Sequence, residues 1–330
     1  MSAAVQPLIW QQDHLRVLDQ RALPHRIEWI ECRDAGAVAT AIHEMAVRGA
    51  PAIGIAAAFG MVLAAQAGQD LSATADRLHA ARPTAVNLRW ALARMRALGT
   101  RDADRLRAEA EAIFEEDLRQ NHEMARHGAD LIRPGSRVLT HCNTGALATA
   151  GHGTALGVIR TAWREGRLSS VYNTETRPWL QGARLTAWEL QQEAIPARLV
   201  ADAAVAELMR AEGIDWVIVG ADRIAANGDT ANKIGTCTLA IVARALGARM
   251  MVVAPSGTFD LGCPSGAEIP IEQRGAEELT QLFGTPIAPA GVAAFNPVFD
   301  ITPAALIDAI VCERGVCHKP DAEGLRMLLG

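Results

Sequence analysis

The first residue whose type and setting suit chemistry is Cys142. It lies between an apolar run and a glycine-rich turn. Residues 137–140 are typical of the end of a buried strand, and the turn leads into a predicted helix. A strand ending in such a turn presents backbone N–H groups and a positive helix end, which together favour anions. The same dipole is expected to lower the pKa of the Cys142 thiol. The segment therefore predicts a small-molecule site, with a buried structural cysteine as the alternative.

A second group of this kind, Asp222, follows the apolar run 216–219. An aspartate at a strand end suits acid–base catalysis because burial raises the pKa of its carboxyl toward neutrality. An ion pair with a neighbouring arginine is the structural alternative. Further along, Asn232 and Lys233 could hold oxygens of an anionic, hydroxylated substrate. For Asp229 a turn or helix-capping role is the preferred interpretation.

Two arginines stand shortly before predicted helices and could bind a phosphate. Arg48 is followed by Gly49 and Ala50, whose backbone N–H groups are free to join it in a phosphate clamp ahead of the apolar helix expected at 55–65. Arg82 occupies the same kind of position before another helix. The alternative for both segments is a tight turn with a solvated arginine.

His141 and His152 flank Cys142 and raise the question of a Cys–His pair. Adjacent residues on a strand point to opposite faces, so we expect His141 to face away from Cys142. For His152, a structural role in the glycine turn is preferred. The sequence lacks HExxH, GxSxG and a complete P-loop, which disfavours zinc hydrolases, serine hydrolases and nucleotidases.

The elements that must position these residues follow an alternating pattern in the second part of the chain. Near-continuous apolar runs of strand length alternate with helical segments, which is typical of a parallel, doubly wound sheet. The expected strands are 137–140, 170–173, 197–201, 215–219 and 249–253, and the expected helices are 153–165, 186–192, 205–211 and 233–246. Polar residues follow most of these strands, namely Cys142, Glu175, Asp202, Asp222 and Ser256. Ligands of such sheets bind outside the carboxyl ends of the strands, so these side chains are expected to converge on one cleft.

The first part of the chain has a different pattern of apolar and polar residues. Short runs at 7–10, 14–18 and 26–31 predict a small antiparallel sheet, and an alanine-rich helical pattern follows from residue 37 to about 128. The fold class is therefore α/β. We expect a small N-terminal domain of helices plus a short antiparallel sheet at 1–128, and a larger C-terminal Rossmann-like parallel-sheet domain at 129–330.

Composition limits the classes of function. Half of the 330 residues are apolar, the formal net charge is −5, and no long basic run occurs, which argues against a nucleic-acid partner. No secretory signal and no transmembrane helix are predicted. The six cysteines are scattered without metal-ligand spacing, so the sequence predicts no metal site and a reduced, cytoplasmic protein.

With these segments in view, the chain resembles the methylthioribose-1-phosphate isomerases of methionine salvage, part of the larger family that includes the regulatory subunits of translation initiation factor 2B. Six segments in order carry the resemblance: RGAPAIG at 48–54, RPTAVNL at 82–88, HCNTGALATAGHGTALGVI at 141–159, TETRPWLQGARLTAWEL at 174–190, GADRIAANGDTANKIGT at 220–236 and NPVFDITP at 296–303. Each alone is a weak signal, and together they are specific.

The resemblance implies conversion of the aldose 5-methylthioribose 1-phosphate to the ketose 5-methylthioribulose 1-phosphate. It places the catalytic aspartate on Asp222, as a proton donor that helps to open the ring. It places the catalytic cysteine on Cys142, which would stabilise the transition state or carry a proton between C2 and C1. Implied substrate-binding positions are Arg48, Gly49, Ala50, Arg82, Gln181, Asn232 and Lys233. It also implies a homodimer that needs no metal or organic cofactor and has a small sugar phosphate as its substrate.

Three alternatives remain at this point. Two are isomerases of 5-deoxyribose 1-phosphate or ribose 1,5-bisphosphate, and the third is a non-catalytic regulatory protein of the initiation factor 2B type, which is expected to lack the Cys–Asp pair. A nucleotide-binding oxidoreductase is disfavoured because GxGxxG does not follow the first strand. The chain departs from the expected family pattern at 196–208 and, slightly, at 271–279.

Overall fold

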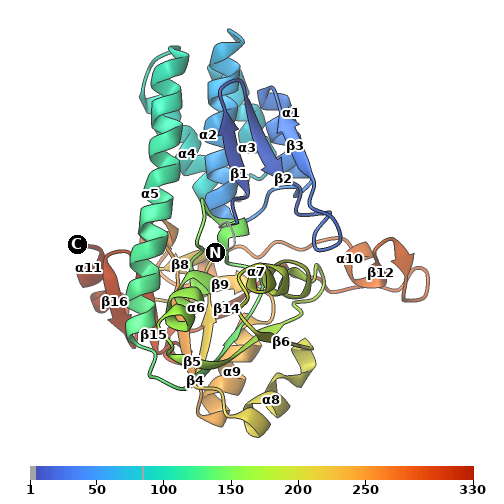
Figure 1. Cartoon of the computed structure of the whole chain (residues 1–330), viewed down its shortest axis with the longest axis vertical. Helices are drawn as coiled ribbons and strands as arrows, with labels where there is room; N and C mark the ends of the chain where they lie inside the picture. The colour runs from blue at the N-terminus through green and yellow to red at the C-terminus, as the bar shows by residue number, and fades with distance from the viewer. Residues whose placement is uncertain (1–4, 84) are drawn as a thin grey trace.

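The computed structural model describes residues 5–83 and 85–330; Thr84, in the 82–88 segment, and residues 1–4 are outside it. Helices and a small sheet form the upper part of the molecule in Figure 1, and a large sheet lies at the centre of the lower part. A short arm carrying α10 (Glu277–Thr280), β12 (Gln281–Leu282) and β13 (Thr285–Pro286) projects to one side.

The N-terminal part matches the expected elements closely. Its antiparallel sheet has the order β1 (Leu8–Gln11), β2 (His14–Leu18), β3 (Trp29–Cys32). The helices that follow are α1 (Ala35–His43), α2 (Ala50–Gln66), α3 (Leu71–Ala80), α4 (Val86–Ala97) and α5 (Ala103–Asp130). Helix α2 is apolar on all sides and is buried from Ala52 to Ala64, which is the position that such a composition favours. The surrounding elements pack onto it, and the core of this part forms around it.

The large sheet has seven strands in the order β16 (Gly315–His318), β15 (Ala309–Cys312), β10 (Arg249–Val253), β7 (Trp216–Val219), β4 (Ser136–Thr140), β5 (Leu168–Thr174), β6 (Ala197–Val200). All neighbours pair in parallel except β15 and β16. The five strands expected from the sequence are therefore confirmed to within about two residues. The hairpin of β15 and β16 extends the sheet beyond them.

Helices cover both faces of this sheet. Alternate residues of β7 belong to different cores: Trp216 and Ile218 pack on the side of α6 (Ala155–Arg164), and Val217 and Val219 on the opposite side. The second side is covered by α8 (Val205–Glu212), α9 (Thr236–Leu246) and α11 (Ala322–Leu329). The short α7 (Ala187–Gln192) lies beyond α6 in the chain. This arrangement confirms an α/β fold with a doubly wound, mostly parallel sheet.

A further sheet corrects one expectation. The chain at 230–233 was expected to lead directly into a helix from residue 233, but it forms strand β9 (Thr230–Lys233), and α9 begins at Thr236. Strand β9 pairs with β8 (Arg223–Ala225) and β14 (Phe299–Thr302), and β11 (Phe259–Asp260) completes the sheet. The pairing with β14, more than sixty residues away, is a long-range contact that local periodicity does not reveal.

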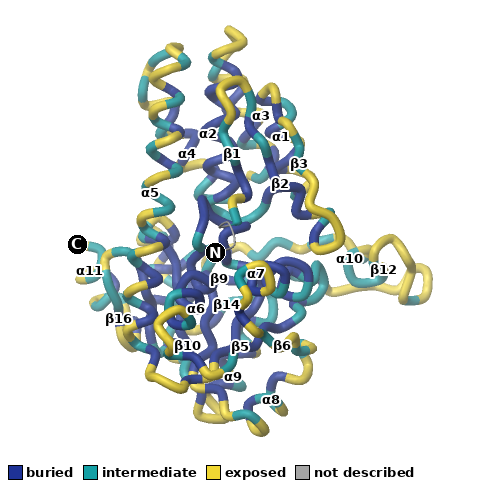
Figure 2. Tube along the Cα trace, in the orientation of Figure 1, coloured by how far each residue is buried: buried dark blue, intermediate teal, exposed yellow. Residues whose placement is uncertain are grey.

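The two parts of the chain share one helix. Residues Leu106 to Ile113 of α5 belong to the N-terminal core, and Met124 and Ala129 belong to a core of the large sheet. Figure 1 shows α5 running along the side of both parts, and Figure 2 shows the buried segments of both parts meeting near its middle. The expected division at 128/129 falls near the end of this helix and stays a prediction.

Candidate active site

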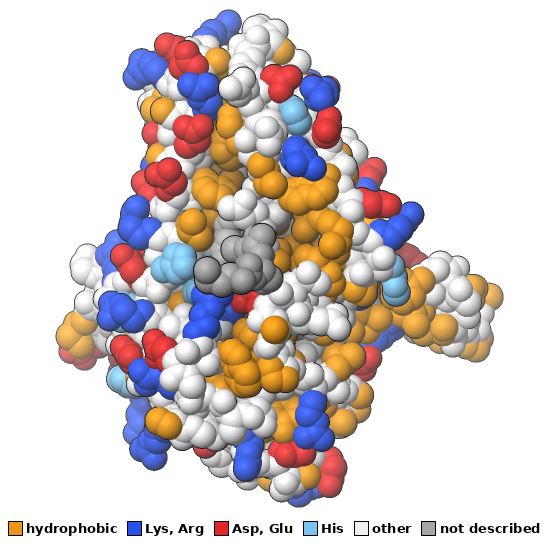
Figure 3. Space-filling model, in the orientation of Figure 1, with side chains coloured by type: hydrophobic (Ala, Val, Ile, Leu, Met, Phe, Trp, Pro, Cys, Tyr) orange, Lys and Arg blue, Asp and Glu red, His pale blue; other side chains and the backbone are white. Residues whose placement is uncertain are grey.

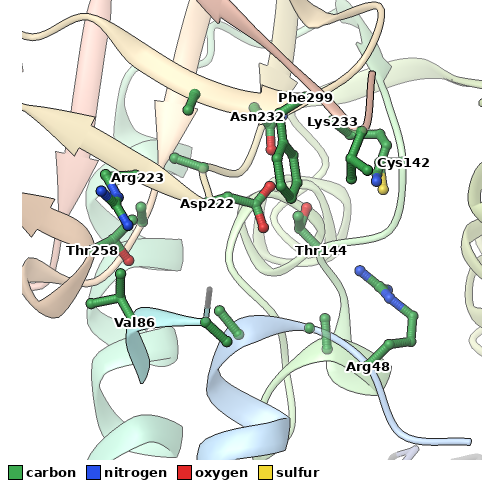
Figure 4. A pocket seen from close by; sticks show the side chains of 18 of the residues that line it. Arg48, Val86, Cys142, Thr144, Asp222, Arg223, Asn232, Lys233, Thr258 and Phe299 are labelled. Atoms are coloured by element: carbon green, nitrogen blue, oxygen red, sulfur yellow. The ribbon is translucent and has the colours of Figure 1, made fainter. Parts of the chain in front are cut away.

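A cleft of about 460 Å³ lies between the helical part and the carboxyl ends of the large sheet's strands. This volume is within the usual range of small-molecule sites, roughly 300–1,000 Å³. All nine positions proposed from the sequence line it: Arg48, Gly49, Ala50, Arg82, Cys142, Gln181, Asp222, Asn232 and Lys233. Figure 4 shows the side chains of Arg48, Cys142, Asp222, Asn232 and Lys233 in this cleft.

The strand order explains why Cys142 and Asp222 meet. From β4 the chain moves outward to β5 and β6, and it then returns to β7 on the other side of β4. Cys142 comes directly after β4, and Asp222 follows β7. The cleft therefore opens at the topological switch point of the sheet, where ligands of this architecture bind. Glu175, Asp202 and Ser256 are not among the lining residues, although Pro255 beside Ser256 is, so the expected convergence holds for only some of the strand ends.

The backbone of Cys142 is held on both sides. Its φ is +63°, its N–H donates to Oγ1 of Thr176 at 2.8 Å, and its carbonyl accepts from Oγ1 of Thr186 at 2.6 Å. The side chain is 4% exposed and faces the cleft. The helix after the turn starts only at Ala155, with a single 3-10 turn at Ala146–Ala148 between them. The helix thus begins two residues after its expected start at 153.

Asp222 is half-buried at the opposite wall of the cleft. Burial raises the pKa of its carboxyl, and the positive charges of Lys233, Arg48 and Arg82 oppose this rise. No ion pair of Asp222 occurs within the described part of the chain, which removes the structural alternative considered for it. A carboxyl in this setting can keep its proton at a higher pH than an exposed aspartate and can donate it to a ligand.

Asn232 and Lys233 enter the cleft from strand β9. The amide of Asn232 donates to Oγ1 of Thr236 at 3.0 Å, which fixes the direction of its side chain. The Lys233 amine lies 4.9 Å from the centre of the Phe299 ring, a cation–π distance. Burial lowers the pKa of Lys233, while the nearby Cys142 and Asp222 act to raise it. The amine of Lys233 thus lies within electrostatic reach of both proposed catalytic groups.

The conformation of the segment at 48–50 depends on the close contact between Gly49 and the backbone of Ala148. Gly49, with φ +95°, precedes the first residue of α2, and a Cβ there would lie 2.6 Å from the backbone of Ala148. Only glycine accepts both conditions. Arg48 donates through Nη1 to the carbonyl of Asn143 at 3.0 Å and to its side-chain Oδ1 at 2.7 Å. The remaining nitrogens of Arg48 face the cleft, in which Figure 4 shows its guanidinium.

The other two predicted binding residues approach from loops. Arg82 precedes α4, as expected, and lies in the field of Arg274 and Glu272. Gln181 is buried, and its Oε1 has no hydrogen-bond partner among residues 5–83 and 85–330. A buried amide oxygen without a partner is costly unless something donates to it, so Gln181 is suited to a ligand hydroxyl.

The histidines take the roles that the strand geometry indicated. His141 points away from the cleft, and its ring joins Oγ1 of Thr174 at 2.6 Å and the carbonyl of Ile234 at 2.9 Å. His152 stacks on His122 with ring centres 4.2 Å apart, and it does not line the cleft. Asp229 accepts from the N–H groups of Ala304 and Gly266, which is the structural role preferred for it.

Comparison with known proteins identifies the family of this chain. Residues 46–319 match the model of the initiation factor 2 subunit family. The methylthioribose-1-phosphate isomerase of Alkalilimnicola ehrlichii is 56% identical, with 98% of each chain covered. That of Stenotrophomonas maltophilia is also 56% identical, over 99% of this chain and 96% of the relative. This chain belongs to the methylthioribose-1-phosphate isomerase family.

Solved structures agree with this family. A 5-methylthioribose 1-phosphate isomerase from Pyrococcus horikoshii has a TM-score of 0.93 at 39% identity, covering 98% of this chain and 95% of its own. A protein described as translation initiation factor eIF-2B, subunit delta, from A. fulgidus has a TM-score of 0.88 at 38% identity, covering 99% of both chains. The predicted fold class and the predicted family are confirmed.

Several lining residues were not predicted as site residues from the sequence. Asn143 lies beside Cys142 in the same motif, but its contact with Arg48 depends on a fold that brings residues 95 apart together. Arg274 and Glu272 come from an irregular segment after β11, and Phe299 comes from strand β14. Asn143 and Phe299 could have been noticed, because they lie inside the quoted segments at 141–159 and 296–303. Glu272 and Arg274 lie in the segment 271–279, where no pattern marks them as functional.

Two kinds of feature are absent from residues 5–83 and 85–330. None of their helices combines the length and hydropathy that a membrane span requires. Nor do they contain a group of three or more His, Cys, Asp or Glu side chains that could hold a metal ion. On the face shown in Figure 3, Lys and Arg side chains are interspersed with Asp and Glu.

Proposed function

We propose that this chain isomerises 5-methylthioribose 1-phosphate to 5-methylthioribulose 1-phosphate, with Asp222 as proton donor and Cys142 beside the carbons that exchange hydrogen. The observation that carries the proposal is that Cys142, Asp222 and a set of cationic side chains, contributed by separate segments, line one cleft at the switch point of the sheet. The family relation supports the reaction class.

The chemistry starts with a closed ring, because a phosphate on C1 prevents spontaneous opening. In the proposed sequence the Asp222 carboxyl gives its proton to the ring oxygen, and the bond between that oxygen and C1 breaks. The raised pKa of Asp222 suits this step because a larger fraction of the carboxyl is protonated near neutral pH. Preorganised positive charge from Arg48, Arg82 and Lys233 would hold the phosphate and the hydroxyls during this step.

The second half moves one hydrogen from C2 to C1. As the C2 carbonyl forms, the proton of the C2 hydroxyl leaves and restores the Asp222 carboxyl, so that the overall reaction is an isomerisation with no net gain or loss of atoms. We place Cys142 at this stage, as a group that stabilises the transition state or carries the hydrogen as a proton. Arg48, Gly49, Ala50, Arg82, Gln181, Asn232 and Lys233 are proposed to bind the substrate.

The test is direct turnover. Purified protein should convert methylthioribose 1-phosphate to its ketose without added metal or cofactor, and Cys142→Ser and Asp222→Asn should each lose at least about a hundredfold in kcat. Near wild-type kcat in both variants would refute the assigned roles. Running the reaction in deuterated water separates the routes, because a proton carried by a group that exchanges with solvent brings deuterium to C1 and a direct hydride shift does not.

Substrate preference is tested with three sugars. Methylthioribose 1-phosphate, 5-deoxyribose 1-phosphate and ribose 1,5-bisphosphate should be compared by kcat/KM under one set of conditions. We expect the methylthio sugar to be preferred, because apolar side chains including Met45, Ile53, Val86 and Ile271 line part of the cleft and a second phosphate would be poorly solvated there. A preference for ribose 1,5-bisphosphate would overturn the substrate assignment.

We also propose that the chain acts as a homodimer in the cytoplasm, without a nucleic-acid partner. Sedimentation velocity at several protein concentrations tests the first point. A single species with the mass of one chain at all of them would refute the dimer.

A further inference from the structure

We propose that Glu189, which lies outside the cleft, is a positioning residue that sets the direction of the Arg48 guanidinium through Asn143. The inference rests on the proposed role of Arg48 in holding the substrate's phosphate. Glu189 is on helix α7 and is 0% exposed, so it cannot touch a ligand in the cleft.

The carboxylate of Glu189 holds the loop that begins at Cys142. It accepts from Nδ2 of Asn143 at 2.7 Å and from the backbone N–H groups of Ala146 and Leu147 at 2.8 and 3.4 Å. Gly145 makes this possible, because a Cβ there would lie 2.4 Å from the Glu189 carboxylate oxygens. A buried carboxylate with three donors from one loop fixes that loop relative to α7.

A second partner keeps the charge of Glu189 in place. Nη2 of Arg160, itself 1% exposed, donates to the same carboxylate at 2.6 Å. The other side of Arg160 is paired with Glu193, where Nε and Oε1 are 2.7 Å apart. The Glu189 oxygens thus accept from Arg160 as well as from the loop, and an acceptor is what the amide of Asn143 needs.

The side-chain amide of Asn143 connects Glu189 to Arg48, because its nitrogen faces Glu189 and its oxygen faces Arg48. Because Nδ2 of Asn143 donates to Glu189, its Oδ1 must point the other way, and Nη1 of Arg48 donates to that oxygen at 2.7 Å. Nη1 also donates to the backbone carbonyl of Asn143 at 3.0 Å, and because the guanidinium is planar, two acceptors on Nη1 set the plane of its other donors as well. Glu189 therefore acts on the phosphate site through one intervening side chain.

The test uses inorganic phosphate as the probe, with its inhibition constant and its direct binding measured by calorimetry. Glu189→Gln replaces one accepting oxygen by a donor and removes the charge, which leaves Oγ1 of Thr186, at 3.2 Å, as the other acceptor for Nδ2 of Asn143. We expect phosphate affinity to fall about tenfold, and the KM for the sugar phosphate to rise by a larger factor than kcat falls. Glu193→Gln is the matched control, because it changes the other carboxylate of Arg160 without touching the loop, and it should leave phosphate affinity within about twofold.

A double-variant cycle separates positioning from general loosening of the structure. In an Arg48→Ala background, Glu189→Gln should produce no further loss of phosphate affinity, since the group it orients is gone. The same tenfold loss in both backgrounds, or unchanged affinity in Glu189→Gln, would overturn the proposal. Should Glu189→Gln alone fail to fold, the neutral pair Glu189→Gln with Arg160→Gln is the replacement, with the same expected loss.

The phosphate measurement also keeps this inference distinct from the proposed reaction. Phosphate binding by the wild type without isomerase turnover would refute the reaction, and the Glu189 comparison would still be decided by affinity. A wild type that does not bind phosphate competitively in this cleft would overturn the Glu189 inference itself.

Discussion

Replacing Gly49 by alanine gives the sharpest test of how the cleft is built. The residue has φ +95° and ψ 133°, a conformation that residues with a Cβ rarely adopt, and such strain costs about 1–3 kcal/mol. The new methyl group would also lie 2.6 Å from Cα, Cβ and the carbonyl oxygen of Ala148, which a rotamer change cannot relieve. Overpacking of this kind adds about 1–3 kcal/mol. Gly49→Ala should therefore lower the free energy of unfolding by about 2–6 kcal/mol.

The assay is urea unfolding with the slope m compared between variants, together with the KM of the reaction. Gly68→Ala is the control: Gly68 also has a positive φ, +66°, but nothing lies within 4 Å of where its Cβ would stand. It should show only the backbone cost, about 1–2 kcal/mol, with KM unchanged. Gly49→Ala should be clearly worse than this control and should raise KM, because the shift displaces Arg48. Equal unfolding free energies for the two variants would refute the reasoning.

Three further predictions concern titratable groups. If Asp222 donates a proton, activity should fall as pH rises through its raised pKa, and this fall should be absent from the residual activity of Asp222→Asn. Burial raises the pKa of Asp117 from 3.8 to about 6. Since the folded value exceeds the unfolded one, the charged form destabilises the fold by about 3 kcal/mol once pH is above both pKa values. Asp117→Asn should therefore increase the unfolding free energy by up to about 3 kcal/mol at pH 8 and by much less at pH 4, as measured by urea unfolding. The pKa of His152 is lowered to about 3 by burial, so it is neutral at pH 7, and His152→Gln should leave kcat within about twofold of wild type; a loss of a hundredfold or more would show that it acts in the reaction.

Local patterns were sufficient for much of the fold. The strands at 136–140 and 216–219 are short apolar runs bounded by polar turns, and their buried positions in a parallel sheet follow from composition alone. The burial of helix α2 could be predicted equally well, because an uncharged, alanine-rich segment of that length is stable only inside a core. Such elements depend mainly on near neighbours in the sequence.

Contacts between segments that are far apart in the chain could not be predicted from the sequence. Strand β9 was expected to lead straight into a helix, since only its pairing with β14 shows that it is a strand. The nine site positions were obtained from strand ends and motif matches, and the structure gathers them in one cleft. Glu189 gave no comparable signal, because its importance comes from three loop donors and one arginine that fold around it.

Helix α5 has a mechanical consequence. Its 28 residues make a rod about 42 Å long, which packs against α2 in one part and against α6 and β15 in the other. Enzymes that close on their substrate by bending between two bodies usually place a flexible joint there. In this protein the chain passes from the N-terminal part to the large-sheet part as one continuous helix, α5. Bending α5 would break some of its backbone hydrogen bonds. We therefore expect the fold to set much of the width of the cleft, and substrate entry to depend on movements of the loops at its rim.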